Sequence, residues 1–109
     1  MNMNQVQARQ VLVDVASGML DGSVNLIEGV RQICDLRFAI GDPNNELFFP
    51  VRAIESQTDS YPLGEMRLNC DEDYLALADG EMDDFLAEVR DELMQACRKI
   101  VRAFSTPRH

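Results

Sequence analysis

The chain has 109 residues, 46% of them apolar, and 19 acids against 10 bases give a formal net charge of −9 at pH 7. This length suits one domain, residues 1–109, and supplies enough apolar material for a single core, which excludes global disorder. The excess of negative charge repels nucleic acid and anionic membranes, so we expect no direct binding to either.

The N-terminal segment and the cysteines indicate the cellular location of the protein. The most apolar stretch near the N-terminus, VLVDVASGML, is interrupted by Asp14, so it does not resemble a signal peptide, and no run approaches the ~20 apolar residues of a membrane span. Cys34, Cys70 and Cys97 are odd in number and far apart, which argues against a secreted disulfide framework. We therefore expect a cytoplasmic protein with reduced thiols.

The first 41 residues predict two helices joined by a tight turn. The turn is the Asp21-Gly22-Ser23 cluster, in which Ser23 is the expected N-cap of the second helix, and Gly41 is expected to stop that helix. Apolar residues at helical spacing are Val6, Leu12, Val13, Val15, Ala16, Met19 and Leu20, then Val24, Ile27, Val30, Ile33, Cys34 and Phe38. So short a connection predicts an antiparallel helical hairpin.

Residues 47–57 can be a helix or a strand. Pro50 suits the start of a short helix in which Val51 and Ile54 share a face, whereas a strand over 48–54 would also fit the alternation. We favour the helix because an isolated strand has no visible partner. After Gln57, the runs Thr58-Asp59-Ser60, Tyr61-Pro62 and Leu63-Gly64 all end regular structure and predict an irregular loop.

The C-terminal third predicts the longest helix, from about Gly80 to Phe104. Its buried stripe consists of Phe85, Leu86, Val89, Leu93, Ala96, Ile100 and Phe104, and its solvent stripe of Asp84, Glu88, Asp91, Gln95, Arg98 and Arg102. A separate helical turn over 70–78 is expected to point Tyr74, Leu75 and Leu77 inward. The predicted fold is thus an all-α compact small bundle: an N-terminal helical hairpin, an irregular central loop and a long C-terminal amphipathic helix.

Catalytic and metal-binding patterns are weak. The only histidine is His109, at the chain end, so neither a cysteine nor a serine nucleophile has an evident base, and Cys34 and Cys97 fall on or beside buried stripes. Asp79, Glu81 and Asp83 alternate as in a calcium loop, but the required glycine and glutamate are replaced. We expect no enzyme activity, no catalytic residue, no metal site and no cofactor.

Acidic residues are concentrated near the C-terminal helix. Residues 71–92 hold ten acids and one base, a net charge of −9 that equals that of the whole chain. This run can be a merely solvated face, a reading of about equal weight. However, like charges four residues apart, such as Asp84 and Glu88, repel each other unless a cationic partner relieves them. The candidate partner-binding residues are Asp79, Glu81, Asp83, Asp84, Glu88 and Asp91.

The loop around residues 54–67 offers a second set of candidates. Glu55 or Asp59 can pair with Arg67 and pin the loop, with Thr58 capping a turn; we favour this structural reading by about two to one. The same residues can also belong to a recognition surface, because loops on rigid scaffolds often carry binding groups.

The runs NLIEGVRQICDLR, IESQTD, YPLG and MR, between Leu26 and Arg67, resemble a group of small uncharacterised bacterial proteins. In that group a Leu-Ile-Glu-Gly helix start is followed by an acidic-Ser-x-Thr-Asp loop and a Pro-x-Gly-x-x-Arg closure. The chain also looks like an immunity protein, which neutralises a toxin used between competing bacteria, in its size, charge and expected fold.

The leading hypothesis is an acidic cytoplasmic binding protein: an immunity protein that covers the basic active site of a nuclease-type toxin. The alternative is a small helical enzyme or ligand-binding domain with a polar pocket near Glu55, Asp59 and Arg67, with Tyr61 as a further lining residue. A homodimer using exposed apolar surface is a third hypothesis. The sequence leaves the oligomeric state and the identity of the partner open.

Overall fold

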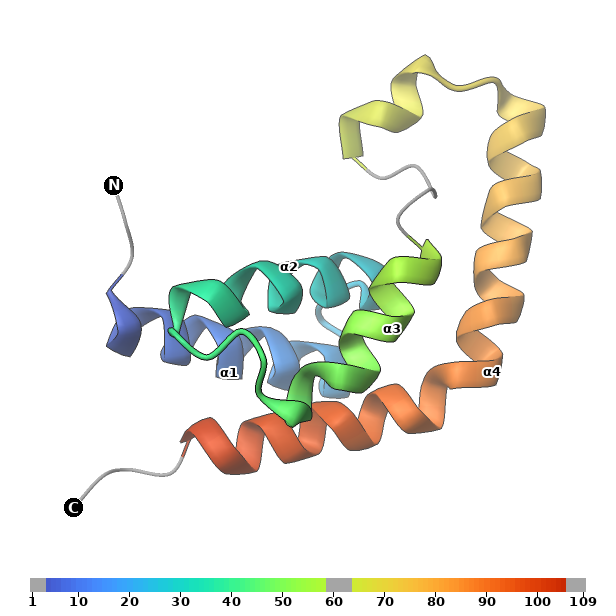
Figure 1. The fold of residues 1–109 in the computed structure, drawn as a ribbon. Coiled ribbons are helices and arrows are strands. Elements are labelled where there is room, and N and C mark those ends of the chain that lie inside the picture. Colours follow the sequence, from blue (N-terminus) through green and yellow to red (C-terminus); the bar gives the residue numbers. More distant parts are fainter. Residues whose placement is uncertain (1–3, 59–63, 106–109) are drawn as a thin grey trace.

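The computed structural model describes residues 4–58 and 64–105. Along these ranges run α1 (Gln5–Asp21), α2 (Leu26–Ala39), the 3₁₀ helix η1 (Glu46–Phe48), α3 (Phe49–Thr58), the 3₁₀ helix η2 (Gly64–Asn69) and α4 (Glu72–Ser105). Every regular element of the described chain is helical, which confirms the predicted all-α class. Figure 1 shows the α1–α2 hairpin and the long α4 beside it.

The turn between α1 and α2 differs from the prediction in its capping residue. Asn25 caps α2, because its side-chain oxygen accepts hydrogen bonds from the amides of Ile27 and Glu28 at 3.0 and 3.1 Å. The prediction that Ser23 is the cap is wrong. The Ser23 amide donates to the Asp21 carboxylate at 2.8 Å, which places this serine inside the turn and starts the helix later.

The hairpin closes at a glycine. A Cβ added at Gly29 would lie 2.6 Å from the Cγ atom of Met19. Real Cβ atoms almost never come so close to another heavy atom. Met19 on α1 is itself 2% exposed, so the two helices meet at a point where only hydrogen fits. The other end of α2 also follows the prediction, since Gly41 has a φ of 78° and ends the helix.

The core lies where α1, α2, α3 and the second half of α4 meet. α1 makes its most extensive packing with α4, and Phe48 stacks on Phe104 with ring centroids 5.9 Å apart. The largest fully buried side chains are Phe48, Leu12, Met19, Ile27, Ile33, Leu93, Ile100, Val30, Val51, Thr58 and Cys97. Most predicted stripe positions of the three long helices thus enter one core.

Residues 49–58 form the helix α3, as favoured over a strand. Val51 and Ile54 are buried on one face, as expected from their spacing. Thr58 is fully buried at the end of the helix, where its hydroxyl donates to the Ile54 carbonyl at 2.9 Å. The Arg31 guanidinium donates to the Thr58 carbonyl at 2.7 Å, which ties this end of α3 to α2.

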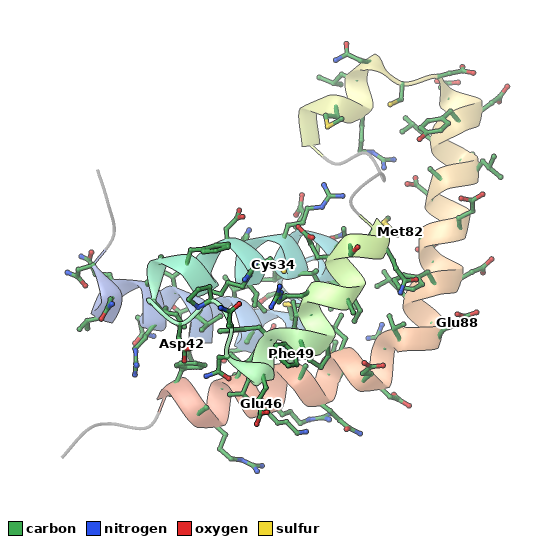
Figure 2. The ribbon with its side chains drawn as sticks, in the orientation of Figure 1. Cys34, Asp42, Glu46, Phe49, Met82 and Glu88 are labelled. Atoms are coloured by element: carbon green, nitrogen blue, oxygen red, sulfur yellow. The ribbon has the colours of Figure 1, made fainter. Side chains whose placement is uncertain are left out.

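α4 begins at Glu72, eight residues before the predicted start at Gly80, and it absorbs the separately predicted turn over 70–78. A single glycine lowers helix propensity by about 1 kcal/mol, which the packing of so long a helix readily overrides. Figure 1 shows that α4 bends, and Figure 2 places Glu88 at the corner. No proline or glycine stands between residues 81 and 105, so no local helix breaker marks this bend.

The first half of α4 and η2 form an arm, residues 64–88, that stands away from the hairpin (Figure 1). On this arm the expectation that Tyr74 and Leu77 point inward is wrong, because they are 49% and 63% exposed. The arm extends past the ends of α1 and α2, so no helix covers its outer side. Val6 and Phe38, predicted in buried stripes, are also exposed, because each lies near the outer end of its helix.

Candidate partner-binding surface

The outer face of α4 gathers four of the six predicted acidic residues. At ~100° of rotation per residue, Glu81, Asp84, Glu88 and Asp91 fall within a sector of about 80°. The inward residues Val89 and Leu93 lie on the opposite side of the helix by the same geometry. All four acids are exposed, and Figure 2 labels Glu88 at the bend of α4.

Two of the predicted acids lie elsewhere. Asp83 is exposed but is rotated by ~100° from Asp84 around the helix axis, so it flanks the surface. Asp79 points to the other side of α4, toward η2. We therefore define the outer acidic face as Glu81, Asp84, Glu88 and Asp91, to which the exposed Glu92 adds a fifth carboxylate at its edge.

Asp79 is already occupied by a cation of the same chain. Both guanidinium nitrogens of Arg67 donate to its two carboxylate oxygens at 2.8 Å. Hydrogen bonds from Arg67 lower the pKa of the Asp79 carboxyl, and those to Asp79 raise the pKa of Arg67. The Arg67–Asp79 contact is the sole ion pair that joins two residues within the described ranges. None of the acids on the outer face therefore forms an ion pair with a described base.

The same face becomes basic farther along the helix. Arg98 and Arg102 continue the stripe beyond Gln95, in line with Asp84 and Asp91. The first half of α4 is therefore negative and the last three turns are positive, an order that also compensates the helix dipole. A partner that covers the whole face needs positive charge opposite residues 81–92 only.

The predicted loop candidates do not form one pocket. Arg67 binds Asp79 rather than Glu55, so the predicted Glu55 pairing is wrong as far as the described residues reach. The Arg67 side chain instead reaches from η2 to the second turn of α4, where Asp79 accepts its hydrogen bonds. Thr58 is buried in a backbone hydrogen bond, whereas Asp59 and Tyr61 lie outside the described residues.

A cavity of about 500 Å³ opens between α2 and α3, and Glu55 is part of its wall. Its lining consists of Cys34, Asp35, Arg37, Phe38, Phe49, Arg52, Ala53, Glu55 and Ser56. The sequence did not predict this groove, because Phe38 was expected in the buried stripe of the second helix. The available sequence feature was the placement of an aromatic residue close to an arginine at two helix ends: Phe38 next to Arg37, and Phe49 three residues before Arg52.

The buried cysteines lie in apolar surroundings. Desolvation raises the pKa of Cys97 to about 11, and that of Cys34 also to about 11 with the nearby Glu55 charge as the second cause. Cys97 packs its sulfur 3.9 Å from that of Met19. Both thiols are therefore protonated near neutral pH, and in the described ranges no three metal-binding side chains of Cys, His, Asp or Glu type gather at one point.

Over the ranges that the structure describes, no helix has the length and apolar composition needed to cross a membrane. Comparison with known proteins found no matching protein-family model, no matching curated protein and no matching solved structure. The surfaces of the chain itself are therefore the basis for a proposed function.

Proposed function

We propose that this chain is an acidic binding protein of the cytoplasm whose outer acidic face docks onto a basic protein. The observation that supports it is the convergence of Glu81, Asp84, Glu88 and Asp91 on one exposed side of α4. Like charges at four-residue spacing destabilise a helix, and no described base offsets them. A cationic partner removes this repulsion, whereas an isolated solvated surface keeps it.

The partner that fits is an enzyme with a positively charged cleft, such as a nuclease-type toxin. Enzymes that act on phosphodiesters place cationic side chains in their active sites to bind a negatively charged substrate. A row of carboxylates along one side of a helix can bind to the same cationic side chains. In this proposal the chain is an inhibitor of the immunity type and performs no catalysis itself. Electrostatic steering then accelerates association, and added salt slows it.

The test compares two variants with the same change of net charge. The face variant carries Asp84→Asn, Glu88→Gln and Asp91→Asn, and the control carries Asp14→Asn, Glu28→Gln and Asp42→Asn, three exposed acids outside α4. Binding kinetics are measured against the product of the adjacent gene at low and at physiological salt.

We expect the face variant to associate at least about tenfold more slowly at low salt and to lose most of the salt dependence of the association rate. The control should behave as the unmodified protein apart from a small general effect of net charge. Equal association rates for the two variants would remove the outer acidic face as the docking surface.

The alternative of a polar pocket at Glu55, Asp59 and Arg67 loses one member, because the Arg67 guanidinium is held by Asp79. Glu55 instead faces a groove of different composition, between α2 and α3. The homodimer hypothesis is separated from both by the mass of the protein in solution.

A further inference from the structure

The groove between α2 and α3 brings together charges of both signs that do not neutralise each other. Asp35 and Arg37 come from α2, and Arg52 and Glu55 come from α3. No ion pair of 4.0 Å or less joins any two of these four described residues, although they line one cavity. The net charge of the groove is zero, and Asp35, Arg52 and Glu55 carry no ion pair within the described chain that would occupy them.

The Cys34 side chain lines the same groove as the four charged residues, and Cys34 is 6% exposed. Burial raises the pKa of this thiol most, and the charges of Glu55, Arg37, Asp35 and Arg52 act on it as smaller causes, which places all four within electrostatic reach of the same sulfur. Because burial keeps this thiol protonated, the floor of the groove is uncharged. Ala53 adds a second apolar group to the lining.

Two exposed aromatic rings mark one end of the groove. Phe38 is 61% exposed and Phe49 is 53% exposed, and each has a guanidinium over its face. The Arg37 Cζ lies 4.1 Å from the Phe38 centroid, and the Arg52 Cζ lies 5.9 Å from the Phe49 centroid. The exposed area of these two rings is apolar surface that the side chain of a ligand can contact at the rim of the groove. Figure 2 labels Cys34 on α2 and Phe49 at the start of α3, and both line this groove.

The helices give the groove a direction. The hydrogen bond from Arg31 to Thr58 ties the end of α3 to the first half of α2, whereas Phe49 at the start of α3 and Phe38 near the end of α2 line the same cavity. The two helices therefore run in opposite senses, with the aromatic rim at one end and Glu55 toward the other. Arg52 lies between them, about one helical turn from each along α3.

Part of this wall is pre-positioned. The Arg37 guanidinium donates to the Pro43 carbonyl at 2.7 Å, which fixes its plane against Phe38. Its Nε is buried and has no hydrogen-bond partner in the described chain. A rigid cation next to an aromatic ring lowers the ordering cost that a small ligand has to offset.

We propose that this groove binds a free amino acid with an aromatic or large apolar side chain. The ligand side chain packs between Phe38 and Phe49, its carboxylate accepts hydrogen bonds from Arg52, and its ammonium group donates to Glu55. A zwitterion pairs with both Arg52 and Glu55, whereas an ion of one sign leaves one of these two side chains without a partner. A cavity of about 500 Å³ is within the size range of small-molecule sites.

The test uses four probes in isothermal titration calorimetry with the full chain. L-Phenylalanine carries the ring and both charges, 3-phenylpropionate lacks the ammonium group, phenethylamine lacks the carboxylate, and glycine lacks the ring. We expect phenylalanine to bind with a Kd of roughly 0.1–1 mM, as suits a ligand of this size, and each of the other three to bind about tenfold more weakly.

Two variants assign the charged contacts. Arg52→Gln should weaken phenylalanine and phenylpropionate about tenfold and leave phenethylamine unchanged, whereas Glu55→Gln should weaken phenylalanine and phenethylamine and leave phenylpropionate unchanged. Both side chains are half-buried at the groove, so both variants are expected to fold, as a thermal melt will verify. Arg98→Gln and Asp14→Asn are the matched basic and acidic controls and should not alter any of the affinities.

Three results would overturn the proposal: no saturable binding of phenylalanine up to about 10 mM, which is tenfold above the expected range; phenylpropionate or glycine binding as tightly as phenylalanine; or equal losses in the control variants. The acidic-face triple variant should bind phenylalanine normally. Failure of this proposal therefore leaves the proposed partner docking untouched, and the converse also holds.

Discussion

Arg67 holds Asp79 through two parallel hydrogen bonds of 2.8 Å, and this pair fastens η2 to the early turns of α4. The two residues are twelve apart in the chain, with the bend at Cys70 between them. Because the fork of a guanidinium matches the two oxygens of a carboxylate, the contact fixes orientation as well as distance. It is the described side-chain contact that closes the arm on itself.

Arg67→Gln should therefore loosen η2 with little effect on the rest of the molecule. The pair is partly exposed, at 35% and 39%, so solvent screens it and the melting temperature should hardly change. Hydrogen exchange followed by mass spectrometry should show faster exchange in residues 64–72 and unchanged exchange in α1 and α2. Arg98→Gln on the same helix is the control. Unchanged exchange in residues 64–72 would show that other contacts hold η2.

The same pair gives the arm a pH dependence. The pKa of Asp79 lies below its ordinary value of 3.8 in the folded chain, so the folded arm binds its proton less readily than the unfolded one. The contribution of the pair is therefore fully present above about pH 4 and is lost as the pH falls through the lowered pKa. Protection of the amides in residues 64–72, measured relative to their intrinsic exchange rate at each pH, should fall below about pH 4. Asp79→Asn should remove this step while leaving other acid-induced changes in place.

The cap of α2 gives a prediction in which neighbouring residues behave differently. Asn25→Ala removes the acceptor for the Ile27 and Glu28 amides and should lower the free energy of unfolding by about 1 kcal/mol. Ser23→Ala removes a long contact of 3.4 Å from its hydroxyl to the Gly18 carbonyl and a hydroxyl interaction with the exposed Asp21 carboxylate, neither of which caps the helix, and it should cost less than half as much. Urea unfolding measures both. A larger effect at Ser23 would contradict the observed cap.

The helices themselves could be predicted from the sequence because apolar spacing specifies which face is buried, and this held for Leu12, Ile33, Leu93 and Ile100. The same spacing does not say whether a neighbouring element exists to cover the face. Leu77 shows this limit: its pattern is that of a buried residue, but the arm projects beyond the helices that would bury it. Exposure at the ends of elements is a tertiary property.

The candidate surfaces show the same division. The outer acidic face could be predicted because Asp84, Glu88 and Asp91 are spaced along a single helix. The α2–α3 groove could not, because its shape depends on how two helices pack against each other, which the spacing of residues within each helix does not specify. The partner of Arg67 was missed for a related reason: the sequence offers several acids near Arg67, and only the three-dimensional placement of η2 beside α4 brings Asp79 within ion-pair distance.

Gly29→Ala should destabilise the hairpin. A methyl group at this position would lie against the Met19 side chain, which is 2% exposed and has no open space to enter. Overpacking of this kind costs about 1–3 kcal/mol, although alanine is the better helix former. Gly80→Ala is the matched control, because nothing lies within 4 Å of its added Cβ, and it should stabilise α4 slightly. Thermal or urea unfolding of both variants checks the opposite signs.

The three cysteines should differ in reactivity with a thiol reagent at neutral pH. A rise of the pKa from 9.0 to about 11 lowers the thiolate fraction of Cys34 and of Cys97 about a hundredfold, and burial also blocks access to both sulfurs. Cys70 is only half-buried, so one thiol per chain should react quickly and two more only after unfolding in urea. Cys70→Ser should abolish the fast phase, whereas a remaining fast equivalent would mean that one of the other two thiols is accessible in the folded protein.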